Sequence, residues 1–293
     1  MQTFAPDLAS RALKRLTSRL ACAVTVALVA PIVLGGCTVT VGSTSLLPKI
    51  RQPVAIIVEP AKGYVRQERM LVLPGLGTVH IARLTRPGNA KTLVYSGGNG
   101  SFVATAGRRL NQLAELSGAD IVTFDYPGRG GTTVPKTTDA LIAFGPALIG
   151  GLRHAGWITS GPVYSYGLSL GGATASNIAR TGGFAGLILE ATASDIPAVA
   201  SNMIPRMVKP FVRVRVSNDL KRYDYLGYAV AAHAPILLIA GQADMTVDFA
   251  TAQRFAIDLR SAGAGVTFVE VPGGHGAALA SEQGQRAVRG FLQ

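Results

Sequence analysis

Apolar runs of strand length alternate with longer segments of helical periodicity through most of this chain. The short runs are almost continuous in Val, Ile, Leu and Phe, which is typical of strands buried on both faces of a parallel sheet. Their alternation with helices predicts an α/β fold, with a mostly parallel central sheet and helices on both faces. We expect strands over 92–96, 121–126, 163–166, 186–191, 235–240 and 266–271, and helices over 102–116, 138–154, 170–180, 249–262 and 277–292.

Two stretches before the first parallel strand have a different pattern. Residues 70–73 and 78–84 are short runs of strand length that are separated by Pro74-Gly75. Glycine supplies the turn here, so the pattern predicts an antiparallel hairpin. Residues 37–60 mix Thr, Ser, Gly and Pro with short apolar stretches, and are expected to form a tether leading into a single domain over 61–293.

Residues 194–234 are too long for a simple crossover between strands and predict a small cap insertion. Between residues 204 and 214 the apolar side chains fall on one helical arc, which predicts an amphipathic helix, although Pro210 weakens it. This helix would either pack its apolar face on the domain or meet an anionic lipid surface. The basic side chains opposite the apolar arc are Arg206, Lys209 and Arg213.

Residues 1–36 have the parts of a bacterial lipoprotein signal peptide. Basic residues precede an uncharged apolar run over 21–34, which is short for a membrane span. The run ends in Leu-Gly-Gly before Cys37, as in signals whose Cys is lipidated, for example with palmitate, and becomes the new N-terminus. We therefore expect Cys37 to be a lipid anchor, although a buried Cys at the end of a signal anchor is the alternative.

The charge and the cysteine content bear on the expected partners and cellular location. The formal net charge is +12, which indicates an anionic surface nearby or only solubility, and no nucleic-acid partner is expected. The chain has two cysteines, and Cys22 lies inside the expected signal peptide, so no disulfide is expected. The expected location is the bacterial cell envelope, with lipid anchorage on the outer-membrane or periplasmic side if the source is Gram-negative.

The sequence Gly167-Leu168-Ser169-Leu170-Gly171 has the pattern G-x-S-x-G between a predicted strand and a predicted helix. A sharp turn from strand to helix needs neighbours without side chains if it is to expose the serine hydroxyl. The helix N-terminus then places backbone N–H groups beside the reacting oxygen. Ser169 is therefore the candidate nucleophile.

A serine nucleophile needs a base, and the base needs a carboxylate to orient it. Asp244 follows the predicted strand 235–240, and His275 follows the strand 266–271. Both positions lie at carboxyl ends of strands, on the rim expected for Ser169. Asp248 is an alternative acid, although it is also placed to cap the helix that begins near Phe249. The other histidines, His80, His154 and His233, are expected to have structural or solvated roles.

An acyl-transfer site also needs donors for a developing oxyanion. Ser-Gly-Gly-Asn-Gly over 96–100 follows the strand 92–96 and supplies backbone N–H groups. We assign one donor to the N–H of Asn99 and the other to the N–H of Leu170, directly after the nucleophile. A plain turn is the alternative interpretation of residues 96–100.

Together these motifs, with Phe-Asp-Tyr-Pro-Gly-Arg-Gly over 124–130, resemble the α/β-hydrolase superfamily, most closely its serine aminopeptidase and Bem46-type members. The resemblance covers about residues 65–292. It departs from the family at Gly97, where such members often have His, and at Asp248, where they often have Pro after Val. The first departure concerns how the oxyanion loop is held, and the second keeps Asp248 as a possible acid.

The resemblance implies a serine hydrolase that cleaves a carboxylic ester or thioester through an acyl-enzyme on Ser169. A serine peptidase or amidase is one alternative, and a catalytically silent lipoprotein that uses the fold as a binding module is another. The expected partners are a small or lipid-like acyl substrate and, through the anchor, a membrane. No metal or organic cofactor is implied, and the oligomeric state stays open.

Overall fold

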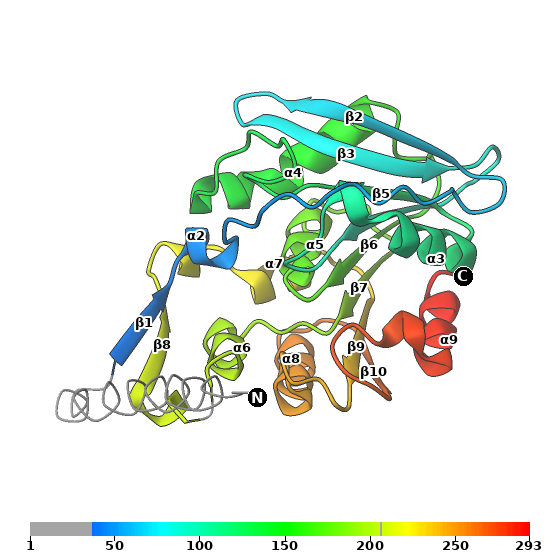
Figure 1. The fold of residues 1–293 in the computed structure, drawn as a ribbon. Coiled ribbons are helices and arrows are strands. Elements are labelled where there is room, and N and C mark those ends of the chain that lie inside the picture. The colour runs from blue at the N-terminus through cyan, green and yellow to red at the C-terminus, as the bar shows by residue number, and fades with distance from the viewer. Residues whose placement is uncertain (1–36, 206) are drawn as a thin grey trace, which may run out of the picture. The chain divides into compact units, whose positions relative to one another are not determined.

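The computed structural model describes residues 37–205 and 207–293, and a mixed β-sheet forms its centre (Figure 1). In this part of the chain the sheet has eight strands in the order β10-β9-β7-β6-β4-β5-β3-β2. The pairs from β10 to β5 are parallel, whereas β3 is antiparallel to both of its neighbours. The strands are β2 (Val65–Leu73), β3 (Gly77–Thr85), β4 (Thr92–Ser96), β5 (Asp120–Phe124), β6 (Val163–Leu168), β7 (Gly186–Glu190), β9 (Ile236–Gly241) and β10 (Val266–Val271).

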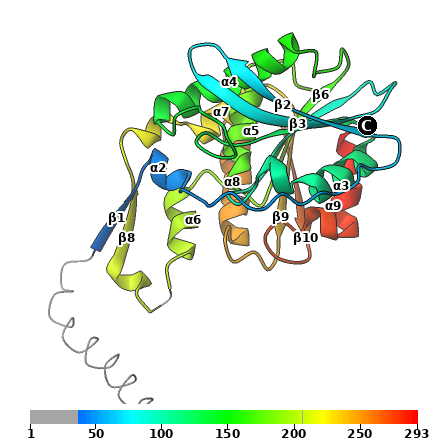
Figure 2. The same cartoon turned by 45° about the horizontal axis from the view of Figure 1, so that its top comes forward.

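Helices cover both faces of this sheet, and each face has its own hydrophobic cluster (Figure 2). On one face pack α3 (Gly107–Ser117) and α9 (Glu282–Phe291). On the other face pack α4 (Thr138–His154), α5 (Gly171–Ala179) and α8 (Phe249–Ser261). Strands β4, β5, β7 and β9 are buried at every residue, as the continuous apolar runs predicted.

The predicted hairpin is confirmed as β2 and β3, which pair from Val65 with Thr85 to Leu73 with Gly77. It is longer than the apolar stretches indicated, because β2 carries a run of polar and charged residues, Arg66 to Arg69, on an edge of the sheet. Gly75 has φ +73° in the turn, the left-handed conformation that glycine adopts without strain.

Residues 194–234 contain α6 (Ile196–Asn202), η2 (Lys209–Phe211), β8 (Val212–Val216), η3 (Leu220–Arg222) and α7 (Tyr225–Ala231). The prediction of an amphipathic helix over 204–214 is wrong. Residues 209–211 form a 3₁₀ turn, and Val212–Val216 is a strand that pairs with β1 (Cys37–Val41) in a separate two-stranded sheet. Pro210 lacks the N–H that a helix needs, and Val-Arg-Val-Arg-Val alternates with the two-residue period of a strand.

Residues 37–39 and 205–213 form a small unit separate from the main one, which comprises residues 40–204 and 214–293. In the small unit Cys37 is exposed, and Met207 and Phe211 are 89% and 51% exposed. In the main unit, the expected tether contains α2 (Ser43–Leu46) and buries Leu47 to 2% exposure in the core. Two further 3₁₀ turns are η1 (Val103–Thr105) and η4 (Ala278–Ala280).

The expected signal peptide and Cys22 lie outside the described residues. Within residues 37–205 and 207–293, none of the helices combines the length and the apolar character needed to cross a bilayer.

Candidate active site

Ser169 lies on the sharp turn between β6 and α5. Its φ is +55°, an uncommon conformation for a residue with a side chain, and its N–H donates to the carbonyl of Glu190 at 2.8 Å. The turn passes very close to the end of β4: a Cβ on Gly171 would lie 2.0 Å from the carbonyl oxygen of Ser96. Glycine is therefore required at this position, and the strained backbone presents Ser169 at the carboxyl edge of the sheet.

His275 and Asp244 meet at the carboxyl ends of β10 and β9. His275 Nδ1 lies 2.9 Å from Asp244 Oδ2. The other oxygen, Asp244 Oδ1, accepts the backbone N–H groups of Thr246 at 2.8 Å and Val247 at 3.0 Å. The Asp244 side chain is only 1% exposed, whereas that of His275 is 33% exposed. This arrangement fixes the ring through Nδ1 and leaves Nε2 able to exchange a proton.

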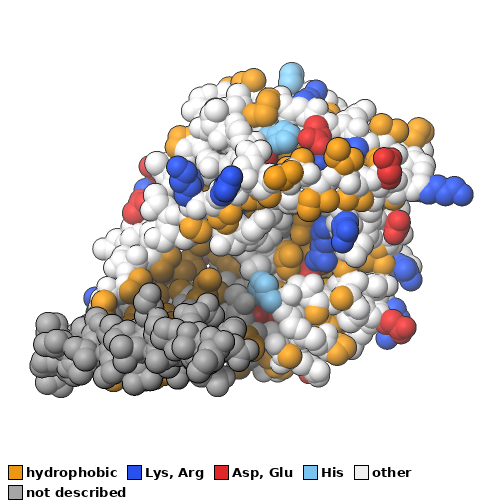
Figure 3. All heavy atoms as spheres, viewed as in Figure 1, with side chains coloured by type: hydrophobic (Ala, Val, Ile, Leu, Met, Phe, Trp, Pro, Cys, Tyr) orange, Lys and Arg blue, Asp and Glu red, His pale blue; other side chains and the backbone are white. Residues whose placement is uncertain are grey.

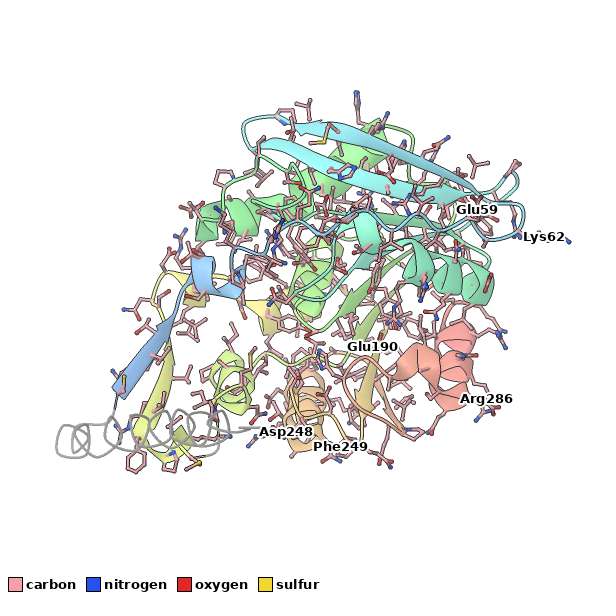
Figure 4. All side chains as sticks on the ribbon, in the orientation of Figure 1. Glu59, Lys62, Glu190, Asp248, Phe249 and Arg286 are labelled. Carbon is pink, nitrogen blue, oxygen red and sulfur yellow. The ribbon has the colours of Figure 1, made fainter. Side chains whose placement is uncertain are left out.

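The alternative acid, Asp248, is at the N-terminus of α8, where Figure 4 labels it beside Phe249. Its carboxylate accepts the N–H of Thr251 at 2.9 Å and the side-chain amide of Asn202 at 2.8 Å. Burial alone would raise the pKa of Asp248, but these hydrogen bonds outweigh it and the pKa is lowered. Asp248 is thus occupied as a helix cap, and Asp244 is the carboxylate that contacts His275.

The His275 loop adjoins the Ser169 turn. A Cβ placed on Gly276 would lie 3.5 Å from Leu168 Cδ1, so the residues flanking His275 and Ser169 are neighbours. No hydrogen bond joins the Ser169 and His275 side chains among the described residues. In unliganded sites of this kind, the contact between nucleophile and base often tightens only when substrate binds.

The loop with Asn99 is held by Arg129, a residue that the sequence did not single out. Arg129 donates through Nη1 to the Asn99 carbonyl and through Nη2 to Asn99 Oδ1, the latter at 2.8 Å. Tyr126 donates its hydroxyl proton to the carbonyl of Gly97. Neither the N–H of Asn99 nor that of Leu170 donates to another described residue, so both are available to a ligand.

Among the described residues, the other histidines make no hydrogen bond to Ser169, Asp244 or His275. His80 is held between two carboxylates, with Nδ1 at 2.8 Å from Asp125 Oδ2 and Nε2 at 3.2 Å from Glu68 Oε2. Burial raises the pKa of Asp125, and hydrogen bonds from Val103 and His80 only partly offset it. His154 is the last residue of α4, and His233 lies between α7 and β9.

An apolar cavity of about 290 Å³ opens beside Ser169. Asn99, Ser169 and Leu170 line one side of it. Figure 3 shows hydrophobic side chains gathered in a recess between the positions of α2 and α6 in Figure 1. The candidate nucleophile and both candidate oxyanion donors therefore border one cavity, which is of the size and apolar character of a small-molecule site.

Solved structures of similar fold come from proteins of low sequence identity. An esterase of Pyrococcus furiosus matches with a TM-score of 0.64 and 16% identity, over 84% of this chain and 97% of that chain. This chain has the α/β-hydrolase fold. An esterase of Pyrobaculum calidifontis matches with a TM-score of 0.56 and 18% identity, over 80% of this chain and 84% of that chain. An acylaminoacyl peptidase of Pyrococcus horikoshii matches with a TM-score of 0.58 and 18% identity, over 78% of this chain and 40% of that chain.

Sequence comparison adds one relative without a described activity. An uncharacterized protein of Mycobacterium tuberculosis is 27% identical over 253 residues, which are 76% of this chain and 86% of that protein. No protein-family model matches the chain.

Within the α/β-hydrolase fold of this chain, Glu190 joins the nucleophile turn to the histidine loop. Its backbone carbonyl accepts the N–H of Ser169, and its Oε1 accepts the N–H of Ala278 at 2.9 Å. Its Oε2 accepts from Arg109 and, at 2.6 Å, from the Tyr166 hydroxyl, whose pKa is raised mainly by burial. Figure 4 labels Glu190 at the end of β7.

Among the described residues, no group of His, Cys, Asp and Glu is arranged to hold a metal ion.

Proposed function

We propose that this protein is a serine hydrolase that cleaves a carboxylic ester or thioester through an acyl-enzyme on Ser169. The observation that carries the proposal is the 2.9 Å contact between His275 Nδ1 and Asp244 Oδ2, because it leaves Nε2 to act on a serine held in a strained turn nearby. The esterase structures of the same fold support the reaction type.

The reaction would proceed in two steps. His275 Nε2 takes the proton of Ser169 Oγ as the oxygen attacks the carbonyl carbon, while Asp244 stabilises the resulting imidazolium. The oxyanion accepts hydrogen bonds from the N–H groups of Asn99 and Leu170. The proton on His275 then passes to the departing alcohol or thiol, which leaves an acyl group on Ser169. A water molecule, deprotonated by His275, then attacks this acyl group. The bond to Ser169 Oγ breaks, the carboxylic acid leaves, and His275 returns the proton to Ser169 Oγ.

Hydrolysis of nitrophenyl esters and nitrophenyl thioesters tests the proposal. The full chain should hydrolyse a short ester, and Ser169→Ala should abolish the activity. Asp244→Asn should reduce kcat by about 10⁴-fold, as loss of the orienting acid does in other triads. Full activity of Ser169→Ala would refute the assignment. If Asp248→Asn lost activity and Asp244→Asn did not, Asp248 would be the acid.

A peptidase activity is the second candidate, since an acylaminoacyl peptidase has the same fold. Acylated aminoacyl nitroanilides, tested beside the matched esters, distinguish the two. Faster turnover of the anilides would make the protein an amidase.

We further propose that the protein is anchored in the bacterial cell envelope by lipid on Cys37. Support comes from the lipoprotein-type sequence around this cysteine and from its exposure. In the small unit that contains Cys37, exposed Met207 and Phe211 lie close in sequence to the basic residues Lys209 and Arg213. A combination of apolar and basic side chains is suited to an anionic membrane surface.

A further inference from the structure

The segment between Cys37 and the central sheet forms part of the cavity beside Ser169. Val41, Leu46 and Pro48 line this cavity, although they precede the nucleophile by more than a hundred residues. Other walls come from the nucleophile turn, from Val199 in α6, and from Met203 directly after that helix. The segment over 41–48 therefore forms a boundary of the candidate site, in addition to joining Cys37 to the domain.

Hydrogen bonds from three different parts of the main unit hold this segment in place. The carbonyl of Val41 accepts the N–H of Ser217 at 2.9 Å, and the carbonyl of Leu47 accepts from Lys136 Nζ at 3.2 Å. The carbonyl of Pro48 accepts from Arg129 Nη2 at 3.1 Å. Leu47 is 2% exposed in the same core cluster as α4 and α5, so apolar burial fixes the segment as well. A wall held in this way can restrict the size of a ligand.

Arg129 connects the segment directly to the candidate oxyanion loop. The nitrogen that donates to Pro48 also donates to Asn99 Oδ1, and the other terminal nitrogen donates to the Asn99 carbonyl. Arg129 is only 4% exposed, and its planar guanidinium can satisfy several fixed acceptors at once. The position of the N-terminal segment and the position of the oxyanion donor are thus set by one side chain.

We propose that residues 41–48 form a wall of the acyl pocket and, with Leu46 as the main contact, limit it to a single acyl chain of medium length. This inference rests on the hydrolase activity proposed above. The lining is largely apolar, so it favours a hydrocarbon chain over a polar acyl group. The volume of about 290 Å³ lies at the lower end of ligand pockets, which excludes a bulky or two-chain acyl group from full burial.

Variants of the full chain test the wall on a series of nitrophenyl esters from butyrate to dodecanoate. Leu46→Trp fills the cavity, and should lower the ratio of kcat/KM for octanoate to kcat/KM for butyrate by about tenfold or more. Leu46→Ala enlarges it, and should extend the preferred chain by one or two methylene groups, each worth about fourfold in kcat/KM. Val199→Trp, which fills the same cavity from α6, should also lower the ratio.

Leu76→Ala is the matched control, because Leu76 is a partly buried leucine on the same core cluster but does not line the cavity. It should leave the octanoate to butyrate ratio within about twofold of that of the unmodified chain. Labelling of Ser169 by a fluorophosphonate shows that each variant is folded with its site intact.

The outcomes separate the inference from the hydrolase proposal. If Val199→Trp changes the ratio and both Leu46 variants do not, the cavity takes the acyl chain but residues 41–48 are not its wall. If none of the three changes the ratio, the acyl chain binds elsewhere. Both results overturn the inference while the hydrolase proposal stands. Absence of ester turnover and of probe labelling in the unmodified chain would instead overturn the hydrolase proposal.

Discussion

Substitution of Glu190 by Gln should destabilise the fold and slow catalysis at the same time. The Glu190 side chain is 2% exposed, and its two oxygens accept from Arg109, Tyr166 and the Ala278 N–H. Glutamine has nearly the same size, but its NH₂ group replaces one carboxylate oxygen. In one orientation this NH₂ group faces the Ala278 N–H, and in the other it faces Arg109 and the Tyr166 hydroxyl, so a donor meets a donor in both. Removing one member of a buried ion pair typically costs 3–5 kcal/mol. The Arg109 side chain is 19% exposed and keeps some hydration, so we expect about 3 kcal/mol.

Urea denaturation of Glu190→Gln, followed by fluorescence, measures this loss. The midpoint should fall with an unchanged slope, because the surface exposed on unfolding is the same. Glu59→Gln is the control, since Glu59 is an exposed carboxylate and should change the free energy of unfolding by less than about 0.5 kcal/mol. A loss below about 1 kcal/mol for Glu190→Gln would refute the argument that this carboxylate braces the fold. The kcat should also fall under native conditions, because Ala278 lies three residues after His275.

Three further predictions concern separate parts of the chain. Asp248→Ala should lower the free energy of unfolding at pH 7 by about 1 kcal/mol. Because the pKa of Asp248 is lowered in the folded state, this destabilisation, measured by urea titration, should shrink as the pH falls through that pKa. An undiminished destabilisation at pH 3 would contradict the prediction. Arg129→Met should reduce kcat for a short ester about tenfold to a hundredfold, with a smaller change in KM, because Asn99 loses its support. Cys37→Ala should abolish incorporation of labelled palmitate in the native host, and unchanged incorporation would exclude lipidation there.

The order of strands and helices could be predicted because most of the parallel strands are nearly continuous apolar runs. The strands over 92–96 and 266–271 and the helix over 138–154 have the predicted bounds, and the other parallel strands and the helices between them differ by up to five residues at their ends. Helix ends depend on local caps: Ser281, for example, accepts the N–H of Gly284, and the last helix begins after it at Glu282. The alternation of apolar, strand-length runs with segments of helical periodicity therefore predicts the α/β fold.

The contacts that support the candidate site could not be predicted, because they join residues distant in sequence. Arg129 reaches Asn99 across 30 positions, and Glu190 reaches Ala278 across 88. No local periodicity marks such pairs. The prediction of a helix over 204–214 is wrong for a different reason. Val and Arg alternate over 212–216 with the two-residue period of a strand, and this local alternation outweighs the helical period of the longer segment. Ser169, Asp244 and His275 could be proposed because each lies within four residues after the end of a recognisable strand.

The most direct test of the central claim is to identify the residue that carries the acyl group during turnover. The full chain, quenched in acid during hydrolysis of a nitrophenyl ester and digested, should yield one peptide containing Ser169 with the added mass of the acyl group. His275→Ala should prevent this labelling, because the serine then has no base. Acylation of a different residue, or ester turnover with no covalent intermediate on Ser169 under conditions where deacylation is slow, would contradict the account.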